Sequence, residues 1–243
     1  IRAFIPREYW DISAELKKKT SDPGQSFTAK LEKADDKKLE IVNENQAVSV
    51  RSELEKQNFV VSDIQKKEKK KYAQPPFTTS KLQQEAFYKL RFPASKTMRV
   101  AQQLYEGLEM GEEGNVGLIT YMRTDAVRVS KESIEAVRSY VQSKYGKDYL
   151  PESPNKFKSK KSAQEAHEAI RPTHLNRRPE DVQAYLDAEE LRVYRLVWNR
   201  AIASQMADAE LLKTTVDFEA ALEEGPAILR ASGSVVTFPG FLK

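Results

Sequence analysis

Residues 74–90 read QPPFTTSKLQQEAFYKL, and this stretch decides the fold because the apolar pattern changes its period here. Leu82, Ala86 and Leu90 recur at the spacing of one helix face. The Thr79-Ser80 pair before them is typical of a helix cap. Similar apolar stripes predict four more helices. One begins at Ser95, one begins at Ser130, one covers residues 162–170, and the last runs from about residue 187 to residue 206. The middle of the chain is therefore mainly helical.

The two ends of the chain favour β structure instead. Over residues 9–16, apolar and polar side chains alternate with period two, as in a half-buried antiparallel strand. Further strands are predicted at residues 27–31, 39–42, 58–64, 216–220, 228–231 and 235–238, and a more helical segment at residues 46–57. The order of β, helical and β segments predicts an α+β multidomain fold. In this fold both chain ends build one discontinuous sheet domain, and a helical domain is inserted between them.

The composition excludes several classes of protein. The 243 residues include 10 Phe, 10 Tyr and 2 Trp, which is enough packing material to exclude collagen-like and simply disordered chains. No apolar run approaches the roughly 20 residues of a membrane helix, so we expect no membrane partner. Cysteine is absent, which excludes disulfides and thiolate zinc sites and favours a cytosolic protein. The chain begins with Ile1 and lacks a signal-peptide pattern, and we expect it to be part of a longer protein.

Positive charge is clustered along the chain, although the net charge is only +4. Lysine runs occur at residues 17–19, 66–71 and 156–161. Clustered lysines beside aromatic residues suit binding to a nucleic-acid backbone, while solvated hairpins or linkers are the alternative. We prefer the solvated alternative for residues 17–19, and the sequence leaves both possibilities open for the other two runs.

Residues 117–125, GLITYMRTD, place Tyr121, Arg123 and Asp125 two apart, so that in extended backbone they share one face. A phenol with its usual pKa of about 10 is a poor nucleophile at neutral pH. A guanidinium beside it could bind a phosphodiester oxygen and neutralise the charge that gathers on phosphorus. Attack on DNA would leave a covalent phosphotyrosine that stores the bond for resealing. On spacing alone, however, packing plus a surface ion pair is the commoner explanation.

Residues 164–172, QEAHEAIRP, carry a second candidate pair. His167 and Arg171 lie four apart, so on a helix they share a face. Together they could hold a phosphate and move the proton of an attacking or leaving oxygen. Taken alone, the histidine is more often an ordinary polar residue of a helix. Zinc binding is excluded, because position 171 is Arg where a second histidine would be required.

Taken together, residues 117–125, 149–155 and 164–172 closely resemble the type IA DNA topoisomerases of bacteria. Residues 4–10 and 75–84 fit the same family, so the resemblance covers essentially the whole chain.

The resemblance implies a role for each candidate residue. Tyr121 would be the nucleophile that forms a 5′-phosphotyrosyl link and releases a 3′-hydroxyl, and Arg123 would contact the scissile phosphate. His167 would act with Asp125 in a hydrogen-bonded relay. The residues expected to contact DNA are Arg123, Arg171, Lys158 and Lys160. The family usually has Ser where this chain has Ala126, so a hydroxyl contact is missing there.

The resemblance also implies an architecture. The family forms a toroid, in which a β-rich arch domain would comprise residues 1–73 plus 208–243. The inserted helical domain with the tyrosine would comprise residues 74–207. The family binds Mg²⁺ through an Asp-x-Asp cluster in a Toprim domain, and this chain contains no Asp-x-Asp. We therefore expect a central fragment without metal ligands of its own, whose other domains, Toprim included, are its partners.

As a function, the resemblance implies ATP-independent relaxation of negatively supercoiled DNA, by transient cleavage, strand passage and religation. The substrate would be a single-stranded segment of underwound duplex. We expect a bacterial, cytoplasmic, nucleoid-associated monomer, and an isolated fragment that is inactive. Two alternatives stay open. A tyrosine recombinase-like strand transferase would attach to the 3′ end, and in a non-catalytic nucleic-acid-binding module Tyr121 would only pack or stack.

Overall fold

A computed structural model describes residues 5–17, 26–34, 37–158, 167–223 and 225–243. The chain divides into two compact units. One unit, here called the sheet unit, comprises residues 1–69 and 211–237, and the other, the helical unit, comprises residues 70–210 and 238–243. The mixture of helices and strands confirms the predicted α+β class.

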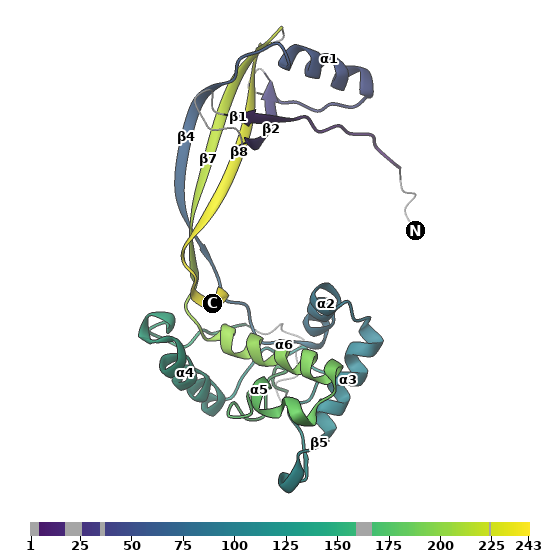
Figure 1. Cartoon of the computed structure of the whole chain (residues 1–243), viewed down its shortest axis with the longest axis vertical. Helices are drawn as coiled ribbons and strands as arrows, with labels where there is room; N and C mark the ends of the chain where they lie inside the picture. Colours follow the sequence, from purple (N-terminus) through teal and green to yellow (C-terminus); the bar gives the residue numbers. More distant parts are fainter. Residues whose placement is uncertain (1–4, 18–25, 35–36, 159–166, 224) are drawn as a thin grey trace. The chain divides into compact units, whose positions relative to one another are not determined.

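Both ends of the chain contribute to one antiparallel sheet. Its strands are β1 (Ser13–Lys17), β2 (Ser26–Ala34), β3 (Lys37–Lys38), β4 (Val60–Lys71), β7 (Ala209–Leu222) and β8 (Gly225–Phe238). The strand order is β1-β2-β8-β7-β4, and β3 pairs with β2. Figure 1 shows the long strands β4, β7 and β8 side by side. The central pairing of β2 with β8 joins the first part of the chain to the last, with Leu31 opposite Leu229.

The core of the sheet unit is small. Its buried members are Ala29, Leu54, Phe218, Ala220, Ala227 and Leu229. Leu54 is supplied by α1 (Glu44–Leu54), which begins at Asn43, whose side chain accepts a hydrogen bond from the Gln46 N–H. This helix confirms the helical segment predicted at residues 46–57.

Three sequence expectations for the strands were wrong in detail. The short strand lies at Lys37–Lys38, while Ile41 forms only an isolated bridge with Trp10. β8 is one strand that includes both segments predicted separately. The strand predicted at residues 58–64 continues through the lysine run at residues 66–71, so that β4 is one long exposed strand at the edge of the sheet. Lysine is a poor strand former, but at an edge its charge discourages pairing with another chain, and the neighbouring strand supplies the hydrogen bonds.

The helical unit is built around α6 (Ala188–Ser204), which packs against α2 (Thr79–Leu90), α3 (Ala94–Glu106), α4 (Lys131–Tyr145) and α5 (Pro179–Val182). Val193, Tyr194 and Val197 of α6 are fully buried, together with Leu82 and Leu104 of the neighbouring helices. After α3 the chain forms a small hairpin, in which β5 (Leu108–Glu109) pairs with β6 (Asn115–Val116). Within the described ranges, no helix has the length and apolar character needed to cross a bilayer.

The helix predicted over residues 162–170 is not formed in the part of it that is described. Residues 159–166 lie outside the described ranges, and residues 167–169 have no regular secondary structure. Ile170 forms an antiparallel bridge with Phe77 and donates its N–H to the Phe77 carbonyl at 2.8 Å. The Ala169 N–H likewise donates to the Arg128 carbonyl at 2.9 Å. These long-range hydrogen bonds replace helical ones, so His167 and Arg171 do not share a helix face.

The first prediction concerns the cap of α6. The Asp187 carboxylate accepts hydrogen bonds from the Glu189 and Glu190 N–H groups, both at 2.7 Å. Replacing Asp187 by Ala leaves both donors unpaired, and we expect the free energy of unfolding to fall by about 1 kcal/mol. Asp187→Asn keeps an acceptor and should stay close to the parent chain. Urea unfolding followed by Trp198 fluorescence measures both, and equal stability of the two variants would contradict the prediction.

Candidate active site

The tyrosine segment, residues 117–125, lies against the histidine segment, residues 167–173. Ile119 forms an antiparallel bridge with Pro172. The Thr120 N–H donates to the Arg171 carbonyl at 2.9 Å, and the Thr173 N–H donates to the Leu118 carbonyl at 3.0 Å. Two irregular stretches that are far apart in the sequence therefore complete each other's backbone hydrogen bonds.

Threonine hydroxyls strengthen this arrangement. The Thr120 hydroxyl donates to the Ala169 carbonyl at 2.7 Å and accepts from the Arg171 N–H at 3.0 Å. The Thr173 hydroxyl donates to the Gly117 carbonyl at 2.8 Å. On the other side of Tyr121, the Thr79 hydroxyl of α2 donates to the Met122 carbonyl at 2.7 Å. The backbone on both sides of Tyr121 is thus fixed by side chains of other segments.

Exposure alternates from Tyr121 to Ala126, so that Tyr121, Arg123 and Asp125 share a face, as their spacing predicted. Met122, Thr124 and Ala126 are buried. Tyr121 is 40% exposed, and Arg123 and Asp125 are also exposed. The buried side chains anchor the segment, and the potentially reactive ones are presented to solvent.

The structure brings Tyr121 and His167 together. Their ring centroids lie 5.8 Å apart, and a second ring, that of Tyr105, packs edge-on against Tyr121 at 5.3 Å. Sequence reasoning missed Tyr105, because its spacing assigned it to the buried stripe of α3, whereas it is 41% exposed. No local signal marks the contact, which depends on how the tyrosine segment docks on the end of α3. There the Leu118 N–H donates to the Leu104 carbonyl at 2.7 Å.

Arg123 and Asp125 are available to a ligand. Among the described residues, neither side chain forms a hydrogen bond or an ion pair, and none joins Asp125 to His167. With no partner in the described part of the chain, the guanidinium of Arg123, two residues after Tyr121, can bind an anion. The relay between His167 and Asp125 stays a prediction.

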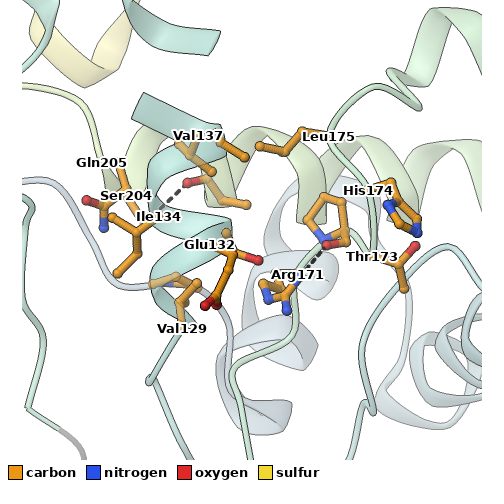
Figure 2. Close-up of a pocket in the computed structure, with 15 residues that line it drawn as sticks. Val129, Glu132, Ile134, Val137, Arg171, Thr173, His174, Leu175, Ser204 and Gln205 are labelled. Carbon is orange, nitrogen blue, oxygen red and sulfur yellow. Dashed lines mark hydrogen bonds between the residues drawn. The ribbon is translucent and has the colours of Figure 1, made fainter. Parts of the chain in front are cut away.

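Arg171 is engaged within the protein. Its guanidinium donates to the Glu168 carboxylate at 3.0 and 2.7 Å and to the Pro172 carbonyl at 2.9 Å. It also lines a cavity of about 220 Å³ that is shared with α4 and α6, as Figure 2 shows. Glu132 of α4 lines the same cavity, and hydrogen bonds from its own backbone and from the Ser130 side chain lower the pKa of its carboxyl group.

This cavity is distinct from the tyrosine site, since Tyr121, Arg123 and His167 do not line it. Of the two lysines predicted to contact DNA, Lys158 is exposed and Lys160 lies outside the described residues. Among the described residues, no three His, Asp or Glu side chains are grouped so that they could hold a metal ion.

Comparison with known proteins identifies the class of this chain. All of it, residues 1–243, matches the family model described as DNA topoisomerase. It is 45% identical over 247 residues to DNA topoisomerase 1 of Rickettsia bellii and 47% identical over 249 residues to DNA topoisomerase 1 of Xylella fastidiosa strain Temecula1. The chain belongs to this topoisomerase family, as its motifs predicted.

The comparisons also define how much of the relatives this chain represents. Both alignments cover 100% of this chain but only 30% of the relative. The structure of full-length topoisomerase I from Thermotoga maritima is similar with a TM-score of 0.70 and 34% identity, covering 88% of this chain and 33% of that one. The chain therefore spans about a third of such proteins or slightly less.

The second prediction tests how the tyrosine segment docks on α3. A Cβ atom added at Gly117 would lie 2.6 Å from the Tyr105 carbonyl oxygen, whereas one added at Gly233 would meet nothing within 4 Å. Gly117→Ala should therefore destabilise the chain by about 1–3 kcal/mol, because rigid backbone must move. Gly233→Ala is the matched control and should change the stability by no more than about 0.5 kcal/mol. Urea unfolding compares them, and an unchanged Gly117→Ala variant would show that the contact is not tight.

Proposed function

We propose that this chain carries the nucleophile of a type IA DNA topoisomerase, and that the intact protein relaxes negatively supercoiled DNA without ATP. The observation that supports this most is the half-exposed Tyr121 ring packed against His167. Two residues further on lies the guanidinium of Arg123, which has no partner among the described residues. Membership of the topoisomerase family supports DNA as the substrate. Because the chain spans 30% of its relatives, the activity belongs to the whole protein.

The proposed reaction is a transesterification. The Tyr121 hydroxyl oxygen attacks the phosphorus of one DNA strand, and a new bond forms between that oxygen and phosphorus. The bond from phosphorus to the 3′ oxygen breaks, and the phenolic proton is transferred to the leaving oxygen. The products are a 5′-phosphotyrosine and a 3′-hydroxyl. Water is not consumed, so after strand passage the hydroxyl can reverse the reaction without ATP.

Each neighbour of Tyr121 has a role in this scheme. Arg123 binds the phosphate and offsets the charge that develops on its oxygens. His167 lies beside the phenol and carries the proton between the attacking and leaving oxygens, with Asp125 orienting the imidazole when DNA is bound. Tyr105 limits the positions of the Tyr121 ring by packing on its other side.

Contacts with the DNA backbone are proposed for Lys158, which is exposed, and for Lys160. Arg171 would have to leave Glu168 before it could bind DNA. Its hydrogen bonds to Glu168 and Pro172 support a positioning role, in which it keeps the histidine segment in shape. We propose that this is its main contribution, and that direct contact with DNA is secondary.

The same proposal divides this chain into two domains of the intact enzyme. Residues 1–73 plus 208–243 form the arch domain, residues 74–207 form the tyrosine domain, and both are parts of a toroid. The Mg²⁺ ion of the intact enzyme would be held by a Toprim domain, and no step is assigned to a metal held by this chain. The substrate is a single-stranded segment of underwound duplex, and the enzyme acts as a monomer in the bacterial cytoplasm, at the nucleoid.

The third prediction tests the nucleophile. The intact protein, incubated with Mg²⁺ and a labelled single-stranded oligonucleotide, should form a covalent adduct at the 5′ end of the break. Tyr121→Phe removes the attacking oxygen and should abolish the adduct. Tyr105→Phe keeps the ring contact and should retain it. An adduct that persists in Tyr121→Phe would exclude this tyrosine, and attachment to the 3′ end would instead favour a recombinase-like reaction.

The fourth prediction concerns Arg123. If its guanidinium contacts the charge of the transition state, Arg123→Gln should slow adduct formation by about 10²–10³-fold, the usual effect of losing one such donor. Oligonucleotide binding should change much less. Lys131→Gln, which removes the same charge from the exposed start of α4, serves as the control. Single-turnover kinetics separate rate from binding, and a control variant that is slowed equally would contradict a specific role for Arg123.

A further inference from the structure

The helical unit contains a groove of about 820 Å³ along α6, here called the α6 groove. It is lined by residues of α6, by the end of α2, and by residues near the end of the chain. Tyr121, Arg123 and His167 do not line it, and neither does any other described residue of the tyrosine or histidine segment. The groove is therefore separate from the proposed reaction site.

The lining of the α6 groove is strongly basic. It includes Lys89 of α2 and Arg192, Arg195 and Arg200 of α6, and among the described residues that line it none is Asp or Glu. Arg192 and Arg195 form no ion pair with any residue in the described part of the chain. A groove walled by uncompensated cations attracts polyanions.

The carboxylate of Glu85 does not line the groove, but it pairs with two of the lining cations and compensates part of their charge. Glu85 pairs with Lys89 at 2.9 Å and with Arg200 at 2.9 Å. Burial opposes the ionisation of Glu85, but hydrogen bonds and charges from these two cations outweigh it and lower the pKa of its carboxyl group. Lys89 and Arg200 therefore share a single negative charge, and the groove keeps an excess of positive charge.

The donors are arranged along one line. Arg192, Arg195 and Asn199 are spaced by three and four residues, which places them on one exposed face of α6. The Arg192 guanidinium donates a hydrogen bond to the Leu90 carbonyl at 3.2 Å and lies 5.0 Å from the centre of the Phe92 ring. Guanidinium groups offer planar pairs of N–H donors that fit phosphate oxygens, and a held side chain loses less entropy when it binds.

The aromatic rings of the groove are already used by packing. Tyr145 packs against Tyr140 and Tyr149, with centroid distances of 6.4 and 6.0 Å, and Trp198 is buried against Tyr140 at 5.2 Å. Proteins that bind single strands stack the bases on exposed aromatic rings. Phe241 also lines the groove and is partly buried against the same core. None of the aromatic side chains among the described lining residues is exposed, whereas Arg192 and Arg195 are, which favours a duplex that is bound through its backbone.

We propose that the α6 groove binds the phosphate backbone of a duplex DNA segment other than the strand that reacts with Tyr121. That the polyanion is DNA rests on the proposed function. Such a site would hold a second segment near the enzyme while the first is cleaved elsewhere in the same unit.

The test measures binding of a short labelled duplex by the 243-residue chain carrying Tyr121→Phe, over a range of salt concentrations. In this background no cleavage can occur, so the result does not depend on the nucleophile. The slope of log affinity against log salt is negative, and each lost phosphate contact makes it less steep by about 0.9. Arg192→Gln with Arg195→Gln should therefore make it less steep by about 1.8. The control pair, Arg51→Gln with Lys56→Gln, removes the same charge from exposed residues of the sheet unit and should leave the slope unchanged.

A second variant protects the test from misfolding, because Arg192 also contacts Leu90 and Phe92. Arg195→Gln alone should make the salt dependence less steep by about 0.9, with an unchanged melting temperature. An equal change of slope in the control pair would overturn the proposal, since the effect would then be general electrostatics. The proposal would also be overturned if the groove variants lost affinity only for a single-stranded probe of the same sequence and not for the duplex. If the duplex-binding result contradicts the α6 groove, the adduct experiment on Tyr121 still tests the proposed function. If the adduct experiment excludes Tyr121 as the nucleophile, the duplex-binding result can still be interpreted.

Discussion

The hydroxyls of Thr79, Thr120 and Thr173 are the constraint on which the candidate site depends. The tyrosine and histidine segments are irregular, so their backbone groups cannot be satisfied by a helix or by a long strand ladder. The threonines supply partners on both sides of Tyr121, and the short bridge between the segments supplies further ones. Carbonyl groups of Phe77, Leu104 and Arg128 accept other hydrogen bonds from the two segments. A phenol and an imidazole from different parts of the chain are thereby held at a defined separation.

The side chains that are positioned in this way are also exposed to solvent, and their exposure does not stabilise the fold. A half-exposed tyrosine and an arginine without a partner in the described ranges contribute little to folding, and they are tolerated because buried neighbours at alternate positions anchor the same segment. The α6-centred core provides the rigid support behind them. The same helix presents its polar face as the α6 groove, so one element serves the core on one side and a charged surface on the other.

The sequence was most informative where periodicity was strong. The stripes of α2, α3, α4 and α6 located those helices, and the spacing after Tyr121 predicted that Arg123 and Asp125 lie on the same face as the tyrosine. It failed at residues 167–170, where an apolar pattern with helical spacing is overridden by hydrogen bonds to Phe77 and Arg128. It also missed the Tyr105 contact and the lysines within β4, because both depend on which segment lies alongside. The roles of the site residues came from the family resemblance and not from spacing.

The pairing of β2 with β8 has a consequence for the order of folding. The two strands are separated by most of the chain, and the entropy of closing such a loop grows with the logarithm of its length. A helical unit that folds first, through its own local contacts, shortens the effective loop. During synthesis we therefore expect β1 and β2 to stay unpaired with β8 until β8 has left the ribosome.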